Sequence, residues 1–125
     1  MAKVRYIVDD VQAAVAFYAE HLGFELAMQA DGFAALDRAD LRLLLNATGG
    51  TGGASRATPD GRRPEPGGWN RFQLPVDDVR AEEARLRDAG LTLRGDVVTG
   101  RGGSQILVED PAGNLVELFE AAARP

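Results

Sequence analysis

The side chains that most often carry catalysis in proteins are scarce in this sequence. Its 125 residues include one histidine, His21, and no cysteine. Without cysteine the chain forms neither a disulfide nor a thiolate zinc site, and it has no cysteine nucleophile. No serine stands in a pattern that would place it beside a base, so no nucleophilic triad is expected. A metal site built within one chain would need mostly oxygen ligands.

Two pairs of adjacent aspartates, Asp9-Asp10 and Asp77-Asp78, resemble the paired carboxylates of acid–base catalysis. Adjacent residues of a strand point to opposite faces, and each pair precedes a helical pattern, so we expect these carboxylates to cap helices. His21 falls in the last turn of the first predicted helix. A cationic ring there is stabilised by the helix dipole, which favours a structural role over a catalytic one.

A glycine-rich segment spans residues 47–68 and holds seven of the fifteen glycines and three of the six prolines. Within it, Gly-Thr-Gly-Gly at 50–53 resembles part of a phosphate loop. The Lys-Ser/Thr pair of a P-loop is missing, however, and no helical pattern follows to bind an anion at its N-terminus. Long loops of this kind are usually lids, binding loops or linkers. We expect a flexible lid or a plain linker.

The balance of 14 basic and 19 acidic residues gives a formal charge of −5. An acidic surface is poorly suited to nucleic acid or to an anionic membrane, because both need clustered basic charge. No apolar run approaches the ~20 residues that span a bilayer, and the N-terminus lacks the apolar region of a signal peptide. The expectation is a soluble cytoplasmic protein of one domain that binds neither nucleic acid nor membrane.

The elements that must position these residues form an internal repeat. Val-Asp-Asp-Val at 8–11 recurs at 76–79, each time after an alternating segment and before a helical pattern that ends near a glycine. The periodicity predicts, in each copy, a strand, a helix and three further strands. The ranges are 3–8, 11–22, 24–28, 33–37 and 41–46, then 71–76, 79–89, 96–99, 104–109 and 115–120. The expected fold is α+β, with βαβββ modules at 1–46 and 69–125 joined by the loop 47–68.

The paired modules, with VDDVQAAVAFYAEHLGFEL opening the first and EDPAGNLVELFE closing the second, resemble the vicinal oxygen chelate superfamily. That superfamily includes glyoxalase I, extradiol dioxygenases, fosfomycin-resistance enzymes and bleomycin-resistance proteins. The resemblance implies two curved sheets around a cup, where relatives hold a divalent metal with His, Gln or Glu. It also implies a homodimer whose clefts are built from both subunits.

Counted from the shared signatures, the resemblance places the four metal-ligand positions at Lys3, Leu43, Arg71 and Glu117. Only Glu117 can bind a cation, because ammonium, guanidinium and leucine side chains offer no lone pair. We therefore expect neither a metal nor another cofactor here. A carboxylate in a cup is costly unless it is paired, so we expect Glu117 to pair with Arg71 or Lys3. This cluster either supports the cup or also orients polar groups of a ligand.

Strand alternation extends the cup to the residues in step with these positions. They are Arg5, Ile7, Leu41, Leu45, Trp69, Gln73, Gln105, Leu107, Leu115 and Phe119. The opposite parity predicts a core of Val4, Tyr6, Phe72, Leu74, Val116 and Leu118. An apolar cavity with a few polar groups is typical of a small-molecule site. Trp69, where the loop rejoins a strand, either packs in the core or stacks on a flat ligand, and Phe33 is a weaker case of the same choice.

These expectations lead to two main hypotheses. The first is a metal-free homodimer, similar to bleomycin-resistance proteins, that gives antibiotic resistance by sequestering a bulky, partly aromatic drug or metabolite without changing it. The alternative is an enzyme of the glyoxalase, isomerase or dioxygenase kind, with Arg71 or Lys3 stabilising an oxyanion and Glu117 acting as base. A relative that binds an ordinary metabolite is a third possibility. The acidic net charge favours a cationic or neutral ligand.

Overall fold

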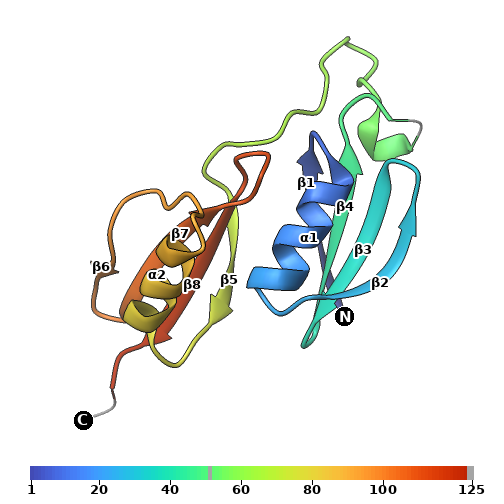
Figure 1. Cartoon of the computed structure of the whole chain (residues 1–125). Helices are drawn as coiled ribbons and strands as arrows, with labels where there is room; N and C mark the ends of the chain where they lie inside the picture. The colour runs from blue at the N-terminus through green and yellow to red at the C-terminus, as the bar shows by residue number, and fades with distance from the viewer. Residues whose placement is uncertain (51, 124–125) are drawn as a thin grey trace. The chain divides into compact units, whose positions relative to one another are not determined.

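A computed structural model describes residues 1–50 and 52–123 of the chain. Its elements follow the order β-α-β-β-β twice, with a short 3-10 helix between the copies (Figure 1). The chain forms two compact units, each built around a four-stranded sheet. The first comprises Met1–Gly67 with Pro111–Asn114, and the second comprises Gly68–Asp110 with Leu115–Pro125. This is the α+β fold of two βαβββ modules that the repeat predicts.

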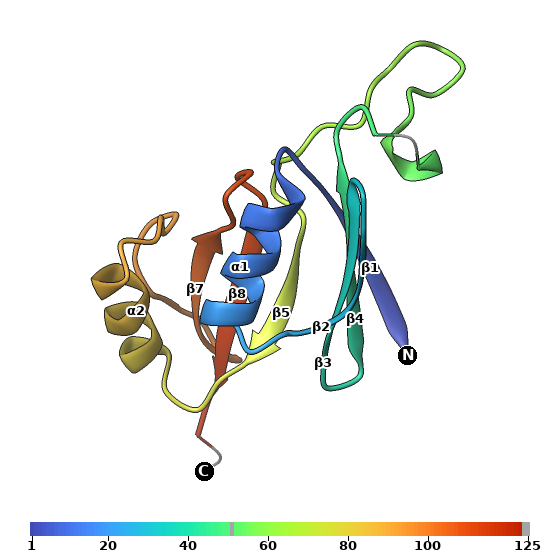
Figure 2. The same ribbon diagram turned by 45° about the vertical axis from the view of Figure 1, so that its right-hand side comes forward.

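The first sheet has the strand order β1-β4-β3-β2, in which β1 and β4 are parallel and the other pairs are antiparallel. Helix α1 covers one face of this sheet, which Figure 2 shows nearly edge-on. The elements are β1 Ala2–Val8, α1 Val11–His21, β2 Glu25–Ala30, β3 Phe33–Arg38 and β4 Leu41–Ala47. A 3-10 helix, η1 Gly53–Ser55, follows within the glycine-rich segment.

The second sheet repeats the arrangement with the order β5-β8-β7-β6, and β5 and β8 are parallel. Helix α2 packs on its strands β7 and β8 (Figure 1). The elements are β5 Arg71–Pro75, α2 Val79–Asp88, β6 Val98–Thr99, β7 Gly103–Glu109 and β8 Leu115–Ala121. Strand β6 contains only two of the four residues expected at 96–99. None of the helices among the described residues is long and apolar enough to cross a membrane.

The aspartates before the two helices act as caps, as predicted. The side chain of Asp10 accepts a hydrogen bond from the backbone N–H of Ala13 at 3.1 Å. Asp78 accepts from the N–H groups of Arg80 and Ala81, both at 3.1 Å. These bonds satisfy amides that have no partner inside the helix, so each helix begins where the sequence places it.

The prediction that alternate leucines of β4 line the cup is wrong. Lys3 lies beside Arg42 in the register, and Val4 lies beside Leu43. The predicted cup residues Leu41, Leu43 and Leu45 therefore share the α1 side of the sheet, where Leu43 and Leu45 are completely buried. The hairpin between β3 and β4 turns on two residues, Ala39 and Asp40, and this short turn sets the register of β4. Leu43 and Leu45 are core residues.

The rest of the predicted core lies on the expected sides of the sheets, although Val4 and Phe72 are only half-buried. Tyr6, Leu74, Val116 and Leu118 are all buried, on the same sides of the sheets as the helices. Along each strand, these residues alternate with the predicted cup residues and therefore point to the opposite face of the sheet. Burial of such apolar side chains stabilises the fold by roughly 1.5–3 kcal/mol per residue. The core thus holds each sheet against its own helix, and no helix of the same module covers the other sheet face.

Candidate functional site

Most of the predicted site residues lie on the sheet faces that the helices do not cover. The face opposite α1, called the Lys3 face, comprises Lys3, Arg5, Ile7, Phe33, Ala35, Asp37, Arg42, Leu44 and Asn46. The face opposite α2, called the Glu117 face, comprises Arg71, Gln73, Gln105, Leu107, Glu109, Leu115, Glu117 and Phe119. Trp69 lies two residues before β5.

Glu117 is the centre of a hydrogen-bonded cluster on the Glu117 face. Its Oε1 accepts a hydrogen bond from Nε of Arg71 at 3.0 Å, and its Oε2 accepts one from Nε2 of Gln73 at 2.6 Å. The three residues meet because β5 and β8 are parallel neighbours that place Gln73 beside Glu117. Glu117 is only 6% exposed. A buried carboxylate is tolerated when its charge is paired and both oxygens accept hydrogen bonds, as they do here.

The donor set of this cluster does not fit the divalent metal that the superfamily resemblance implies. Both oxygens of Glu117 already accept hydrogen bonds, and the neighbouring Arg71 has no lone pair. On the other module, the position beside Lys3 is held by Arg42, which is equally unable to bind a cation. Among residues 1–50 and 52–123, no group of three or more His, Cys, Asp or Glu side chains is arranged to hold a metal ion.

Trp69 is 66% exposed, which excludes the prediction that it packs in the core. The guanidinium carbon of Arg94 lies 4.6 Å from the centroid of its ring, within range of a cation–π contact. Arg94 is itself held in place, since it donates to Oε2 of Glu109 at 3.2 Å and to the carbonyl of Gly68 at 3.0 Å. The indole therefore has a supported orientation although much of it is open to solvent.

The remainder of the Glu117 face is partly apolar. Leu107 lies beside Glu117 in the register, and Phe119 lies beside Gln105 one row further along. These three side chains, Leu107, Gln105 and Phe119, are all half-buried. The face thus combines an oriented polar cluster with apolar side chains, which is the composition of a small-molecule surface.

The Lys3 face is arranged in rows that run across the four strands. The first row contains Lys3, Arg42, Asp37 and, from β2, Glu25. The second row contains Arg5, Leu44, Ala35 and Met28, and the third contains Ile7, Asn46, Phe33 and Ala30. Phe33 is half-buried, whereas Lys3 and Arg5 are exposed on the edge strand β1. One end of this face is charged and the other is mainly apolar.

Asp37 and Arg42 form a two-pronged ion pair on this face. Oδ1 of Asp37 accepts from Nε of Arg42 at 2.7 Å, and Oδ2 accepts from Nη2 at 2.8 Å. These hydrogen bonds lower the pKa of the Asp37 carboxyl below its usual value and outweigh the opposing effect of desolvation. Since two of the three guanidinium nitrogens of Arg42 donate to Asp37, one to each oxygen, this carboxylate is held within the sheet.

Sequence reasoning missed Asp37, Arg42 and Glu109 as members of the two faces, and Arg94 as the partner of Trp69. The first two carry a readable signal, because residues equally distant from a two-residue hairpin turn lie opposite one another. Glu109 keeps the parity of Leu107, so alternation along β7 also indicates it. Arg94 lies in an irregular segment, where no periodicity indicates what a side chain contacts.

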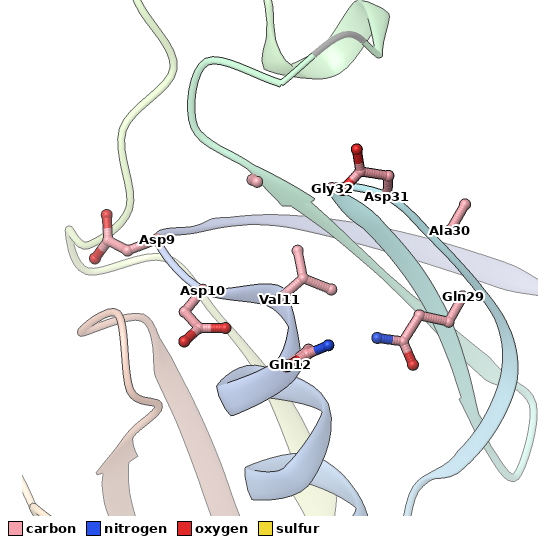
Figure 3. A pocket seen from close by; sticks show the side chains of 9 residues that line it. Asp9, Asp10, Val11, Gln12, Gln29, Ala30, Asp31 and Gly32 are labelled. Atoms are coloured by element: carbon pink, nitrogen blue, oxygen red, sulfur yellow. The ribbon is translucent and has the colours of Figure 1, made fainter.

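A separate pocket lies at the beginning of α1, with a volume of about 610 Å³ (Figure 3). Its lining comprises Asp9, Asp10, Val11, Gln12, Gln29, Ala30, Asp31, Gly32 and Ala47. The amide of Gln29 points toward Gln12 across it. None of the predicted site residues lines this pocket. His21 lies in the last turn of α1, also outside the two faces, as the sequence predicts.

Comparison with known proteins identifies consistent relatives of the chain. Residues 1–118 match the model of the glyoxalase/bleomycin resistance protein/dioxygenase superfamily. A lactoylglutathione lyase from Agrobacterium tumefaciens is 25% identical, with a TM-score of 0.76 over 96% of this chain and 92% of that one. A superfamily member from Sphaerobacter thermophilus DSM 20745 has the same identity and TM-score, over 96% and 95% of the two chains.

TnmS3, an antibiotic binding protein from Streptomyces sp. CB03234, is 26% identical. Its TM-score is 0.72, and the match covers 98% of this chain and 95% of that one. No curated protein matches the sequence. The structural relatives thus include both an enzyme and a binding protein, so the chemistry of the site must discriminate between these functions.

Proposed function

Because the chain belongs to the glyoxalase/bleomycin resistance protein/dioxygenase superfamily, we propose that it sequesters a bulky, partly aromatic small molecule, such as an antibiotic, without metal and without catalysis. One observation carries this proposal. Both oxygens of Glu117 accept hydrogen bonds from Arg71 and Gln73, and the guanidinium beside the carboxylate opposes a metal cation there, which supports ligand binding over metal chemistry. The cluster then serves to orient polar groups of the ligand.

The surroundings of Trp69 support a ligand with a flat ring. An exposed indole offers a large apolar face for stacking, and Arg94 at 4.6 Å holds the ring from one side. A contact of this kind contributes about 0.5–1 kcal/mol at an exposed site, which restricts the motion of the ring before a ligand arrives. Phe119 and Leu107 add apolar surface on the same module. The similarity to the antibiotic binding protein TnmS3 agrees with this use of the fold.

The proposed binding unit is a homodimer, in which a second copy completes each cleft. The superfamily resemblance implies this assembly. With no bond made or broken, protection would come from affinity alone and would saturate at one ligand per cleft. Loss of the dimer would then abolish binding together with assembly.

The proposal is tested by titrating the protein with bleomycin, daunorubicin and mitomycin C, followed by calorimetry. We expect at least one compound to bind with Kd below about 10 μM, because an affinity weaker than ~7 kcal/mol protects poorly. Trp69→Ala should weaken that binding about tenfold, whereas Trp69→Phe, which keeps a flat ring, should weaken it much less. Asn70→Ala, at the exposed neighbouring position, provides the matched control.

Three results would overturn the proposal. The first is the absence of binding below about 10 μM for every compound tested. The second is one tightly bound divalent ion per chain in metal analysis of the purified protein. The third is turnover of a bound compound, detected by mass spectrometry of the recovered ligand, which would establish the enzyme alternative. Size-exclusion chromatography with light scattering measures the assembly independently of any ligand.

A further inference from the structure

The positive charges of the Lys3 face are not balanced by carboxylates. In the described part of the chain, Arg42 is paired with Asp37, whereas neither Lys3 nor Arg5 forms an ion pair. Glu25 belongs to the same row as Lys3 but stands on β2, three strands away. At a strand spacing of about 4.8 Å, the two backbones are roughly 14 Å apart, beyond the distance at which exposed charges interact strongly.

This local excess is opposite in sign to the charge of the whole chain. The formal net charge is −5, and the only lysine of the sequence is the one on this face. Lys3 and Arg5 are two residues apart on one strand, so they project from the same face about 7 Å from one another. An ammonium and a guanidinium at this spacing can both donate hydrogen bonds to one carboxylate, sulfonate or phosphate group.

The two cations border the apolar part of the same face. Arg5 lies in the row of Leu44 and Ala35, and the next row holds Ile7 and Phe33. Leu44, Ile7 and Phe33 are all half-buried and so expose part of their apolar surface. A molecule that combines a ring with an acidic group would place the ring against this apolar surface and the acid between Lys3 and Arg5.

We propose that the ligand of this protein is an anionic aromatic molecule, whose acidic group is recognised by Lys3 and Arg5 on the Lys3 face. The proposal rests on the proposed function, and it replaces the cationic or neutral ligand that the net charge suggested. Charge complementarity at short range decides the preference, because exposed charges further than about 10 Å away are largely screened at physiological salt.

The experiment compares ligands that share one ring system and differ in charge: anthraquinone-2-carboxylate, its neutral carboxamide and a cationic 2-(aminomethyl) derivative. Calorimetry on the full chain should show the carboxylate binding about tenfold more tightly than the carboxamide, with the cation weakest. Raising NaCl from about 50 to about 500 mM should weaken only the carboxylate. This last comparison uses the unaltered protein and so does not depend on whether a variant folds.

Variants assign the effect to the two side chains. Lys3→Gln and Arg5→Gln should each weaken carboxylate binding about tenfold and leave carboxamide binding unchanged. Lys3→Arg should bind the carboxylate as tightly as the unaltered protein, because the positive charge remains. Arg80→Gln, on the exposed surface of α2, removes one positive charge elsewhere and is the matched control.

The outcomes separate this inference from the proposed function. Equal or tighter binding of the carboxamide or the cation would overturn the anionic preference while leaving the binding function in place. If Lys3→Gln and Arg5→Gln weakened binding of the carboxylate and the carboxamide equally, the anionic preference would also be overturned. The two residues would then have only a structural role at the edge of the sheet. If none of the three compounds and none of the antibiotics bound below about 10 μM, both proposals would fall.

Discussion

At the scale of single residues, the chemistry of this protein depends on which carboxylates are already occupied. Glu117 accepts hydrogen bonds at both oxygens from Arg71 and Gln73, and Asp37 accepts two from Arg42. Such pairing reduces the cost of holding charge against apolar surroundings, and it also leaves fewer lone pairs open to a metal or a proton. On the Lys3 face of the described chain, the cations Lys3 and Arg5 form no ion pair, which supports the proposed recognition of an anion.

The ion pair of Asp37 predicts a specific dependence of stability on pH. Because hydrogen bonds from Arg42 lower the pKa of Asp37 in the folded state, its contribution is complete above the unfolded value of about 3.9 and is lost as pH falls through the lower folded value. Asp37→Asn should therefore destabilise the protein most above about pH 5, and the difference from the unaltered chain should vanish toward about pH 2. Urea unfolding between these pH values measures it.

A matched carboxylate provides the control for this pH series. Asp31 is exposed and takes part in no ion pair among the described residues, so Asp31→Asn should change stability little at any pH in the series. A destabilisation by Asp37→Asn that stays constant down to about pH 2 would mean that packing of the side chain, and not its charge, is responsible.

At the scale of the elements, local signals decide where helices and strands begin and end. The caps Asp10 and Asp78 start both helices at the predicted positions, and alternation locates the long strands to within one or two residues. The short strand β6 is the exception, since only Val98 and Thr99 pair with β7. Two residues are too few for a periodicity to be visible, and their strand conformation depends on the neighbouring strand.

Gly103 shows how one residue can determine the end of such a hairpin. It has φ 152° and pairs with Ala121, and a Cβ at this position would lie 2.1 Å from the carbonyl oxygen of Glu120 and 2.9 Å from Cζ of Phe119. Gly103→Ala should therefore destabilise the protein by more than about 1 kcal/mol, because backbone must move to relieve the clash. The free energy of unfolding in urea measures the effect.

Gly100 in the same hairpin is the control, since a Cβ there would meet nothing within 4 Å. Gly100→Ala should leave the free energy of unfolding nearly unchanged or raise it slightly. Equal effects of the two substitutions would show that β7 and β8 separate at this end at little cost. The pairing of Gly103 with Ala121 would then not be needed to position Phe119 on the Glu117 face.

At the scale of the whole molecule, the turn between β7 and β8 belongs to the first compact unit although its strands belong to the second. Asn114, the last residue of this turn, hydrogen-bonds to two other segments of the first unit. Its Nδ2 donates to the carbonyl of Ile7 at 2.8 Å, and its Oδ1 accepts from the N–H of Gly67 at 2.8 Å. One buried amide therefore joins the turn, the strand β1 and the end of the glycine-rich segment.

Replacing this amide should affect stability more than its size suggests. Asn114→Ala removes the hydrogen bonds to the carbonyl of Ile7 and the N–H of Gly67. Because Ile7 is half-buried and Gly67 is exposed, water can replace part of what is lost, and the cost is about 0.5–1.5 kcal/mol for each bond. We expect a lower unfolding midpoint in differential scanning calorimetry. Asn70→Ala, at an exposed position, is the control, and equal midpoints for the two variants would contradict the role given to Asn114.

Much of this arrangement could be predicted from sequence because it depends on local periodicity. Alternation correctly separated Arg71, Gln73 and Glu117 from the core residues Leu74 and Val116. The repeat correctly implied two βαβββ modules, and the shared signatures correctly indicated the superfamily. A period of two determines the side of its own strand on which each residue lies, and no tertiary information is needed for it.

The pairing between distant strands was decided only by the tertiary structure. Whether Lys3 lies beside Arg42 or Leu43 depends on a turn that determines the register of β4, and a shift of one residue moves every side chain to the opposite face. Contacts between distant segments, such as Gln73 with Glu117 and Arg94 with Trp69, arise in the same way. The sequence by itself determined the modules and the residue types on their faces, whereas the folded arrangement decided which charges are paired and which remain free.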